Sequence, residues 1–515
     1  MSIGWIIFIV AALGWHIGLY GMFKKAGIEG WKAFIPFYNT WCMVQKMELK
    51  WYWFVVQFIP IAGQFITIWI TIKFVEHFGR FGFWHHAATV LLPFLYFPYL
   101  GFSANEKYAG VAVVRNYKKS GWREWIDAAA FAVVAATLIR TFVFEAYVIP
   151  TPSMEKTLLV NDYLFVSKSA YGPRLPNTPL ALPFIHNSIG QTGMKSYAEW
   201  LHIPYIRWFA SPINRNDIVV FNFPTNDTLI NNPDFGSQTT YYQEIRNEMR
   251  QGRLNAQQAR DAVWDQYGSQ IITRPVDKRE NFIKRCVGIP GDTIQVINGK
   301  LMVNGQPQPL FPQSERYYKL QVPPNVIPDH DLLIGMGIDI RESQGDLQAL
   351  DNAGLYRVNI TNEEKANLKL PKDYILSDYL IDYTDPFYRS DELYPYYDSS
   401  KHWTVDNFGP LGVPKKGAII PLTADNVIRY QRCIEVYESN TLESKEGKYF
   451  INGKEASTYT FKMDYFWLMG DNRHNSLDSR YWGFVPEDHV VGKASLIWFS
   501  WEGGPRWKRI FRMIH

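Results

Sequence analysis

Hydrophobic and polar positions are distributed unevenly along this chain of 515 residues. Long apolar runs dominate the part before residue 150, whereas the remainder alternates apolar and polar positions between turns rich in proline, glycine and asparagine. A helix needs about 20 apolar residues to cross a bilayer, and alternation with a period of two is typical of strands. The pattern therefore predicts N-terminal transmembrane helices followed by a mainly antiparallel β domain.

Four apolar segments have about the length of a transmembrane helix, at residues 3–22, 51–72, 83–102 and 125–144. We assign the first three to a polytopic membrane region (1–124) and the fourth to an anchor (125–147). The first segment lacks a basic start and a small-residue cleavage site, so we expect an uncleaved anchor. A removable signal peptide is the alternative.

Basic residues are concentrated in two of the loops between these segments. The first loop contains Lys24, Lys25, Lys32, Lys46 and Lys50, and the third contains Lys107, Arg115, Lys118, Lys119 and Arg123. The second contains only Lys73 and Arg80. Because loops rich in lysine and arginine stay in the cytoplasm, we predict that everything after the fourth segment is extracytoplasmic.

The globular part is interrupted by two insertions. Strand-like runs assign residues 148–308 and 446–505 to a β core, in which Asn-Gly at 298–299 predicts a tight hairpin. Apolar residues at helical spacing predict a helical insertion at about 225–278. The segment 309–445 is rich in tyrosine, proline and aspartate and predicts a second, inserted lobe.

The tail, residues 506–515, has a helical pattern of its own. Trp507, Ile510, Phe511 and Ile514 fall on one helical face, with basic residues elsewhere. The pattern fits an amphipathic helix at a membrane surface, and it fits docking of the tail onto the β domain at least as well.

Composition narrows the choice of partners and cofactors. The net charge of +4 is mild, and no basic stripe interleaved with aromatic residues occurs, so we do not expect a nucleic-acid partner. Cys42, Cys286 and Cys433 lack the spacing of a zinc site or of a disulfide framework. We therefore expect no metal and no cofactor.

Candidate chemistry begins at Ser153 in "VIPTPSMEKTLL" (148–159), where the apolar front gives way to the β part. A nucleophilic serine needs a base. Lys156 forms the S-x-x-K pattern of penicillin-binding proteins and β-lactamases, but the S-D-N and K-T-G elements of those enzymes do not occur. The other candidate is Lys284, in the apolar strand-like run "ENFIKRCVGIPGD" (280–292).

Lys284 can act as a base near pH 7–8 only if its pKa falls far below the reference of about 10.4. Desolvation by Phe282, Ile283 and Val287 would lower that pKa. Successive strand residues face opposite sides, so we expect one of Lys284 and Arg285 to be buried while the other reaches water. The alternative for Lys284 is a stem packed on the sheet with its amine in solvent.

Polar and charged groups are dense in "LMGDNRHNSLDSRYWGFVP" (468–486). Such a segment is suited to form a hydrogen-bonded wall beside a site. The alternative is an Asx-rich loop that braces only itself, with Asp478 and Arg480 as a structural pair.

Four segments, in this order, resemble bacterial signal peptidase I, a family of membrane-bound Ser/Lys endopeptidases that remove signal peptides from exported proteins. They are "IPTPSMEKTLLVNDYLFVSKSAYG" (149–172), "RNDIVVFNFP" (215–224), "NFIKRCVGIPGD" (281–292) and "GDNRHNSLDSRYWGFVP" (470–486). The apolar run before the serine also resembles the family's membrane anchor. The resemblance implies the family's β fold, which LexA-type Ser/Lys proteases share.

The resemblance implies a role for each matching residue. Ser153 is the expected nucleophile, Lys284 its general base, and Ser476 the residue that orients the lysine. The Ser153 N–H and the Thr151 hydroxyl are the expected oxyanion hole. The remaining expected members are the supporting residues Asp478 and Arg480 and the substrate-pocket residues Ile149, Leu158, Phe282 and Ile283. His474 departs from the family, which usually has Asp there, so a charge at that point would depend on pH.

The implied function is cleavage of signal peptides after small residues of the Ala-x-Ala type. The resemblance places the protein in the bacterial cytoplasmic membrane with its catalytic domain on the periplasmic side. Exported preproteins and the lipid bilayer are the expected partners, and the export machinery is a further candidate.

Two other functions fit parts of the pattern. A LexA-type self-cleaving protease shares the Ser/Lys chemistry, but such proteins are soluble and carry a DNA-binding module, which the four apolar segments argue against. A membrane scaffold whose β domain has lost activity is the second. The intact set of Ser153, Lys284 and Ser476 argues against it.

Overall fold

The computed structural model describes residues 3–58, 62–118, 121–190, 193–232, 235, 240–309, 311–324, 326–335, 337–340, 345–351, 353–382, 392–396 and 402–514. The chain divides into two units, Met1–Leu138 and Ile139–His515.

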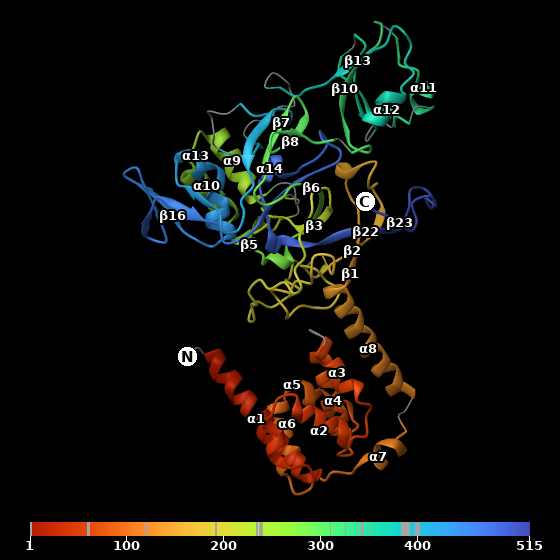
Figure 1. The fold of residues 1–515 in the computed structure, drawn as a ribbon, viewed down its shortest axis with the longest axis vertical. Helices are drawn as coiled ribbons and strands as arrows, with labels where there is room; N and C mark the ends of the chain where they lie inside the picture. The colour runs from red at the N-terminus through yellow and green to blue at the C-terminus, as the bar shows by residue number, and fades with distance from the viewer. Residues whose placement is uncertain are drawn as a thin grey trace. The chain divides into compact units, whose positions relative to one another are not determined.

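The first unit is helical (Figure 1). Gly14, Gly18 and Gly21 of its first helix lie against the backbone of α6, so these two helices pack with no room for a Cβ between them. Its elements are α1 (Ile3–Lys25), η1 (Gly30–Phe34), α2 (Tyr38–Lys46), α3 (Tyr52–Val56), α4 (Ala62–Glu76), α5 (Phe83–Leu91), α6 (Pro93–Phe102) and α7 (Val111–Asn116), followed by α8 (Gly121–Phe142), which continues into the second unit.

Two of the predicted spans are wrong as continuous helices. Segment 83–102 is divided between α5 and α6, because Pro93 has no N–H to donate and Leu92 before it is not helical (φ −133°, ψ 42°). Segment 51–72 is divided between α3 and α4, and its residues 59–61 lie outside the described residues.

The other two predicted spans coincide with single helices. Residues 3–22 fall within α1, and residues 125–144 overlap α8. Across the described ranges, however, we find no helix with both the length and the apolar character needed to cross a membrane.

The second unit is built on an antiparallel sheet with the strand order β1-β2-β22-β3-β6-β20-β21, and β23 pairs with β22. The predicted mainly antiparallel β domain is thus confirmed. The pairing of β6 with β3 and β20 brings together segments that are far apart in the sequence. The strands are β1 (Phe144–Val148), β2 (Asp162–Ser167), β3 (Ile218–Asn222), β6 (Asn281–Gly288), β20 (Tyr465–Met469), β21 (Val485–Pro486), β22 (Val490–Ser500) and β23 (Arg512–Met513).

A second sheet has the order β14-β7-β8-β9 and contains the predicted hairpin. That prediction is confirmed, because Asn298 and Gly299 have positive φ (49° and 73°) and join paired strands. β14 comes from the predicted lobe 309–445, so this part of the segment belongs to the second sheet. The strands are β7 (Thr293–Ile297), β8 (Lys300–Val303), β9 (Gln306–Pro307) and β14 (Phe408–Gly412).

Two further groups of elements occupy the predicted insertions. Helices α9 (Tyr241–Gly252) and α10 (Ala256–Tyr267) lie between β4 (Thr228–Ile230) and β5 (Ile271–Thr273). What we call the four-stranded lobe, coloured green to teal in Figure 1, has a buried cluster of its own. It comprises β10 (Glu315–Gln321), α11 (His330–Gly335), β11 (Leu347–Ala349), β12 (Leu355–Thr361), α12 (Asn362–Asn367) and β13 (Ile375–Asp378).

Short elements complete the second unit. The segments that matter for the site are the 3-10 turn η2 and the short helix α14. Among the described residues, these elements are η2 (Pro152–Met154), η4 (Gly268–Gln270), η5 (Val276–Lys278), β15 (Ile419–Pro421), α13 (Ala424–Arg432), η7 (Cys433–Tyr437), β16 (Leu442–Lys445), β17 (Lys448–Ile451), β18 (Lys454–Ala456), β19 (Thr458–Thr460), α14 (Ser479–Trp482) and η8 (Glu487–His489).

The predicted helix in the tail 506–515 is wrong. Residues 507–511 form turns, and the following strand β23 pairs with β22. Ile514 joins a buried cluster of the β domain, and Arg509 forms an ion pair (2.5 Å) with the fully buried carboxylate of Asp162. A helix this short is marginal by itself, so strand pairing and the buried ion pair decide the conformation.

The tail ion pair predicts a stability defect. In Arg509→Met the carboxylate of Asp162 stays buried without its main cation, and we expect a loss of about 3 kcal/mol in the free energy of unfolding. Lys508→Met, an exposed neighbour, should stay within about 0.5 kcal/mol of the parent. Thermal and denaturant unfolding of the two variants tests this, and equal melting of both would contradict it.

Candidate active site

The backbone of Ser153 is held in place by a distant loop. Ser153 lies in η2, where the buried side chain of Met154 anchors the turn. The Asn472 N–H donates to the Ser153 carbonyl oxygen (3.2 Å), and the Asn472 side-chain amide donates to the Pro152 carbonyl oxygen (3.3 Å). The loop after β20 therefore sets where the serine hydroxyl can lie.

Lys284 comes from the middle of β6 and meets that hydroxyl. Its Nζ donates to Ser153 Oγ at 2.7 Å and to the Ile283 carbonyl oxygen at 3.0 Å. Lys284 is 3% exposed and Ser153 is 8% exposed. The structure thus brings together the two residues of the predicted pair, which are 131 positions apart.

The environment of Lys284 favours a neutral amine. Burial lowers its pKa from the usual 10.5 to about 8, against the opposing influence of Asp478 and Asp471. Both of these carboxylates are occupied by arginines: Asp471 pairs with Arg285 and Asp478 with Arg480. In the described part of the chain no carboxylate forms an ion pair with Lys284, so its charged form is left uncompensated.

The expectation that one of Lys284 and Arg285 reaches water is wrong. Arg285 is 1% exposed. Its guanidinium binds both oxygens of Asp471 (2.8 and 2.6 Å) and lies 3.8 Å from the ring centroid of Phe311. A guanidinium can be buried on the opposite face because a carboxylate and an aromatic ring compensate its charge there.

Lys156, the alternative base, is directed elsewhere. Its Nζ lies 3.0 Å from Glu364, 3.5 Å from Asp346 and 3.6 Å from Glu315. Burial by itself lowers the pKa of Lys156, but these carboxylates outweigh burial and raise the pKa above its usual range. A lysine held as a cation cannot accept the serine proton, so the geometry favours Lys284.

Ser476 and the Asp478–Arg480 pair surround Gly470. The Ser476 hydroxyl is buried and has no hydrogen-bond partner among the described residues. A Cβ added to Gly470 would collide with Ser476 Oγ and lie 2.5 Å from the Ser153 carbonyl oxygen. Asp478 pairs with Arg480 at 2.7 Å and accepts the Gly470 N–H at 3.2 Å. Ser476 and the Ser153 backbone therefore both lie against Gly470, and Asp478 of the ion pair helps to hold that glycine.

The remaining predicted site residues are Thr151, which is exposed, and four apolar residues, which lie in two different clusters. Thr151 is exposed and extended (φ −133°, ψ 153°), and its side chain makes no capping hydrogen bond. Ile149, Leu158 and Ile283 lie in one apolar cluster. Phe282 belongs to a different cluster, where it stacks on another phenylalanine at 4.2 Å between ring centroids. Three of the four predicted pocket residues are thus brought together.

Sequence reasoning missed how the loop around His474 is held. The ring Nε2 lies 2.9 Å from both oxygens of Asp406, and Nδ1 accepts the Tyr317 N–H at 2.8 Å. No local sequence pattern could have revealed these contacts, because the partners are 68 and 157 positions away.

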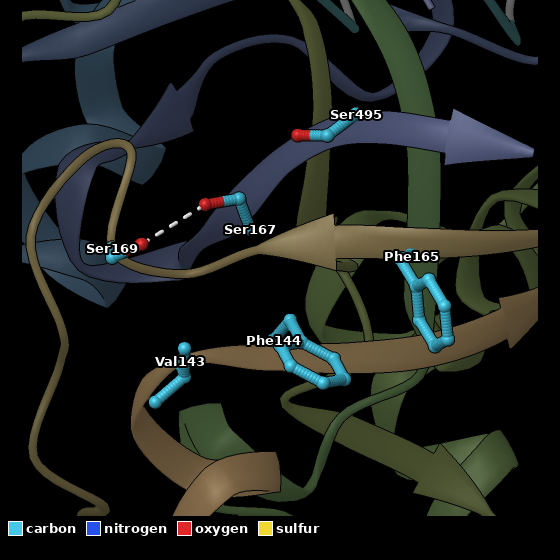
Figure 2. A pocket seen from close by; sticks show the side chains of 6 residues that line it. All are labelled: Val143, Phe144, Phe165, Ser167, Ser169 and Ser495. Carbon is cyan, nitrogen blue, oxygen red and sulfur yellow. Dashed lines mark hydrogen bonds between the residues drawn. The ribbon is translucent and has the colours of Figure 1, made fainter. Parts of the chain in front are cut away.

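A cavity of about 310 Å³ lies where the second unit begins. Figure 2 shows its lining residues, Val143, Phe144, Phe165, Ser167, Ser169 and Ser495. Two of its serine hydroxyls bond to each other at 3.1 Å. None of the predicted site residues lines this cavity, so it is separate from the Ser153 site.

A serine hydroxyl bonded to a buried lysine amine on an antiparallel sheet is the arrangement of a serine hydrolase. The family model described as signal peptidase, peptidase S26, matches residues 122–329 and 421–501, which is more than half of the chain. The chain therefore belongs to the peptidase S26 family of signal peptidases and is a serine endopeptidase. A second model, described as a family of unknown function (DUF5684), matches residues 31–111.

Curated relatives agree with this assignment. A signal peptidase I of Buchnera aphidicola subsp. Baizongia pistaciae is 22% identical over 395 residues, covering 73% of this chain and 79% of the relative. One from Buchnera aphidicola subsp. Acyrthosiphon pisum is 25% identical, covering 72% of each. One from Haemophilus influenzae is 24% identical, covering 75% of this chain and 74% of the relative.

The close contact at Gly470 predicts loss of activity on a one-carbon change. Gly470→Ala must displace Ser476 or the Ser153 carbonyl, and an error of about 1 Å in a reacting group can cost about 100-fold in kcat. We expect a fall of that order in preprotein cleavage. Gly504→Ala, where an added Cβ meets nothing within 4 Å, is the matched control. Parent-like cleavage by Gly470→Ala would contradict this account of the site.

Proposed function

We propose that this protein removes signal peptides from exported preproteins with Ser153 as nucleophile and Lys284 as general base. The observation that carries the proposal is the 2.7 Å hydrogen bond between Lys284 Nζ and Ser153 Oγ in a buried setting. The low pKa of Lys284, about 8, supports a neutral amine at that position. The alternative lysine is held as a cation by carboxylates of the four-stranded lobe.

In the proposed reaction, Ser153 Oγ attacks the scissile carbonyl carbon while neutral Lys284 takes the hydroxyl proton. The tetrahedral intermediate collapses when the C–N bond breaks, and Lys284 gives its proton to the leaving amine. The signal peptide is then an ester of Ser153. Lys284 next takes a proton from a water molecule, whose oxygen attacks the ester carbonyl. The bond to Ser153 Oγ then breaks, Lys284 returns the proton to that oxygen, and the free enzyme is restored.

Two further roles complete the proposed site. The Ser153 N–H and the Thr151 hydroxyl would donate hydrogen bonds to the oxyanion, where one lost donor typically costs about 100- to 1,000-fold in kcat. The exposed, uncapped side chain of Thr151 supports this role. Ser476 would orient Lys284, and its buried, unpartnered hydroxyl beside Gly470 supports that assignment.

The proposed specificity is for small residues before the cleaved bond. Ile149, Leu158 and Ile283 would form an apolar wall beside the serine, leaving room for alanine, glycine or serine of an extended substrate. Export signals carry such residues at their cleavage sites. Phe282 would line the site from the side of β6 that also carries Lys284, because alternate residues of a strand face the same way.

The proposed location follows from the sequence. The basic loops favour a multi-pass protein of the bacterial cytoplasmic membrane with its catalytic unit on the periplasmic side. There a translocated preprotein would present its cleavage site beside the bilayer. Preproteins and lipid are the proposed partners, and the export machinery is a further one.

The catalytic pair predicts complete dependence on two side chains. We expect Ser153→Ala and Lys284→Met each to lower preprotein cleavage by the purified full-length protein by about 10³-fold or more. Lys300→Met, an exposed lysine of β8, should cleave like the parent. Processing is measured by the shift in preprotein mass. If both site variants retain parental rates, the assigned chemistry is wrong.

The low pKa of Lys284 predicts the pH dependence of cleavage. Lys284 is an active base only when deprotonated, and with a pKa of about 8 its neutral fraction rises about tenfold between pH 7 and pH 9. The kcat/KM for a synthetic signal-peptide substrate should therefore rise along a single titration centred near pH 8. A rise that begins only near pH 10 would indicate an ordinary lysine and exclude a buried base.

A further inference from the structure

Lys156 closely follows the nucleophile, yet the proposed chemistry does not use it. It adopts a positive φ of 63°, which is uncommon for a residue that has a Cβ. Its side chain is 24% exposed and its Nζ lies within 3.6 Å of carboxylates from the four-stranded lobe. The backbone thus takes an unfavourable conformation that directs this amine into the lobe.

Three separate elements of the lobe supply those carboxylates. Glu315 is the first residue of β10, Asp346 immediately precedes β11, and Glu364 belongs to α12. Two of them are fixed within the lobe: Asp346 accepts the Asp339 N–H at 2.9 Å, and Glu364 accepts the Thr361 N–H at 2.8 Å in a capping box. The amine therefore meets a site whose geometry the lobe sets.

The lobe also holds the loop on the other side of the serine. The Glu315 N–H donates to the Asp471 carbonyl oxygen (2.9 Å), and the Arg473 N–H donates to the Glu315 carbonyl oxygen (2.9 Å). The Asn359 side-chain amide of β12 donates to Asn472 Oδ1 at 3.1 Å. Asn472 in turn holds the Ser153 carbonyl, so one connection from the lobe reaches Ser153 through Asn472 and the other reaches Lys156, three residues after the serine.

The charges at the contact between Lys156 and the lobe make that contact depend on the lysine amine. Burial, reinforced by Asp346, raises the pKa of Glu315 to about 9, and the Lys156 amine opposes that rise. Burial also raises the pKa of Asp346. Lys156 is the cation beside these buried acids, and its Nζ lies closest to Glu364, at 3.0 Å.

We propose that Lys156 is a positioning residue, through which the four-stranded lobe clamps the turn 152–154 and fixes Ser153 Oγ against Lys284. The inference rests on the proposed function of that pair. Asp346 and Glu364 lie between the two stretches that the peptidase S26 model matches, 122–329 and 421–501. The clamp thus joins residues between the two matched stretches to the catalytic core of the family.

Kinetics of lysine variants test the clamp. In the full-length protein, Lys156→Met should lower kcat about 10- to 100-fold and leave KM within about twofold, because a misplaced nucleophile slows chemistry rather than binding. Lys156→Arg keeps the cation and should recover most of kcat. Lys300→Met is the exposed-lysine control and should match the parent.

A second comparison separates positioning from stability. Lys156→Met should also lower Tm, because it leaves buried acids without their cation. Adding Asp346→Asn and Glu364→Gln removes the unpaired acids, so the triple variant should regain Tm while kcat stays low. Recovery of kcat together with Tm would show a purely structural role and overturn the clamp.

The outcomes also distinguish the two proposals. If the parent is active and Lys156→Met has the same kcat, the clamp is wrong, whereas the Ser153–Lys284 chemistry still stands. A parent that leaves preproteins uncleaved would overturn the proposed function and the clamp with it.

Discussion

The burial of one lysine amine without a counter-ion is the constraint on which the catalytic unit depends. An amine in water keeps its proton to about pH 10.4, whereas burial brings the pKa of Lys284 to about 8. Acidic groups nearby would cancel this effect if they were free. Arg285 and Arg480 occupy them as buried ion pairs, one with Asp471 and one with Asp478. Because Asp471 and Asp478 are each paired with an arginine, the Lys284 amine has no counter-ion among the described residues.

This constraint explains why the site is assembled from distant segments. A strand inside the sheet can bury a lysine to its amine, and β6 lies between β3 and β20. The proposed nucleophile must instead approach substrate, and Ser153 lies in a short turn outside the strands. A turn of that kind has little rigidity of its own, and Asn472 and Gly470 position it from the loop after β20.

The four-stranded lobe fits the same logic. Glu315, the first residue of β10, hydrogen-bonds through its backbone to the loop at 471–473. Carboxylates of the lobe surround Lys156. A lobe that served only as decoration would need no buried charges at its junction with the core, because burying them costs free energy unless they are well paired. The junction places those charges beside the turn of Ser153, where rigidity would matter most for the proposed reaction.

The sequence by itself determined the antiparallel β fold, the Asn298-Gly299 hairpin and the pairing of Ser153 with Lys284, because turn chemistry, strand periodicity and long motifs are written in neighbouring residues. Only the tertiary structure decided that Arg285 is buried beside Lys284 and that the tail forms a strand. It also decided that Lys156 faces the lobe rather than the serine. These outcomes depend on which groups compensate a buried charge or complete a sheet, and the local sequence patterns did not reveal those partners.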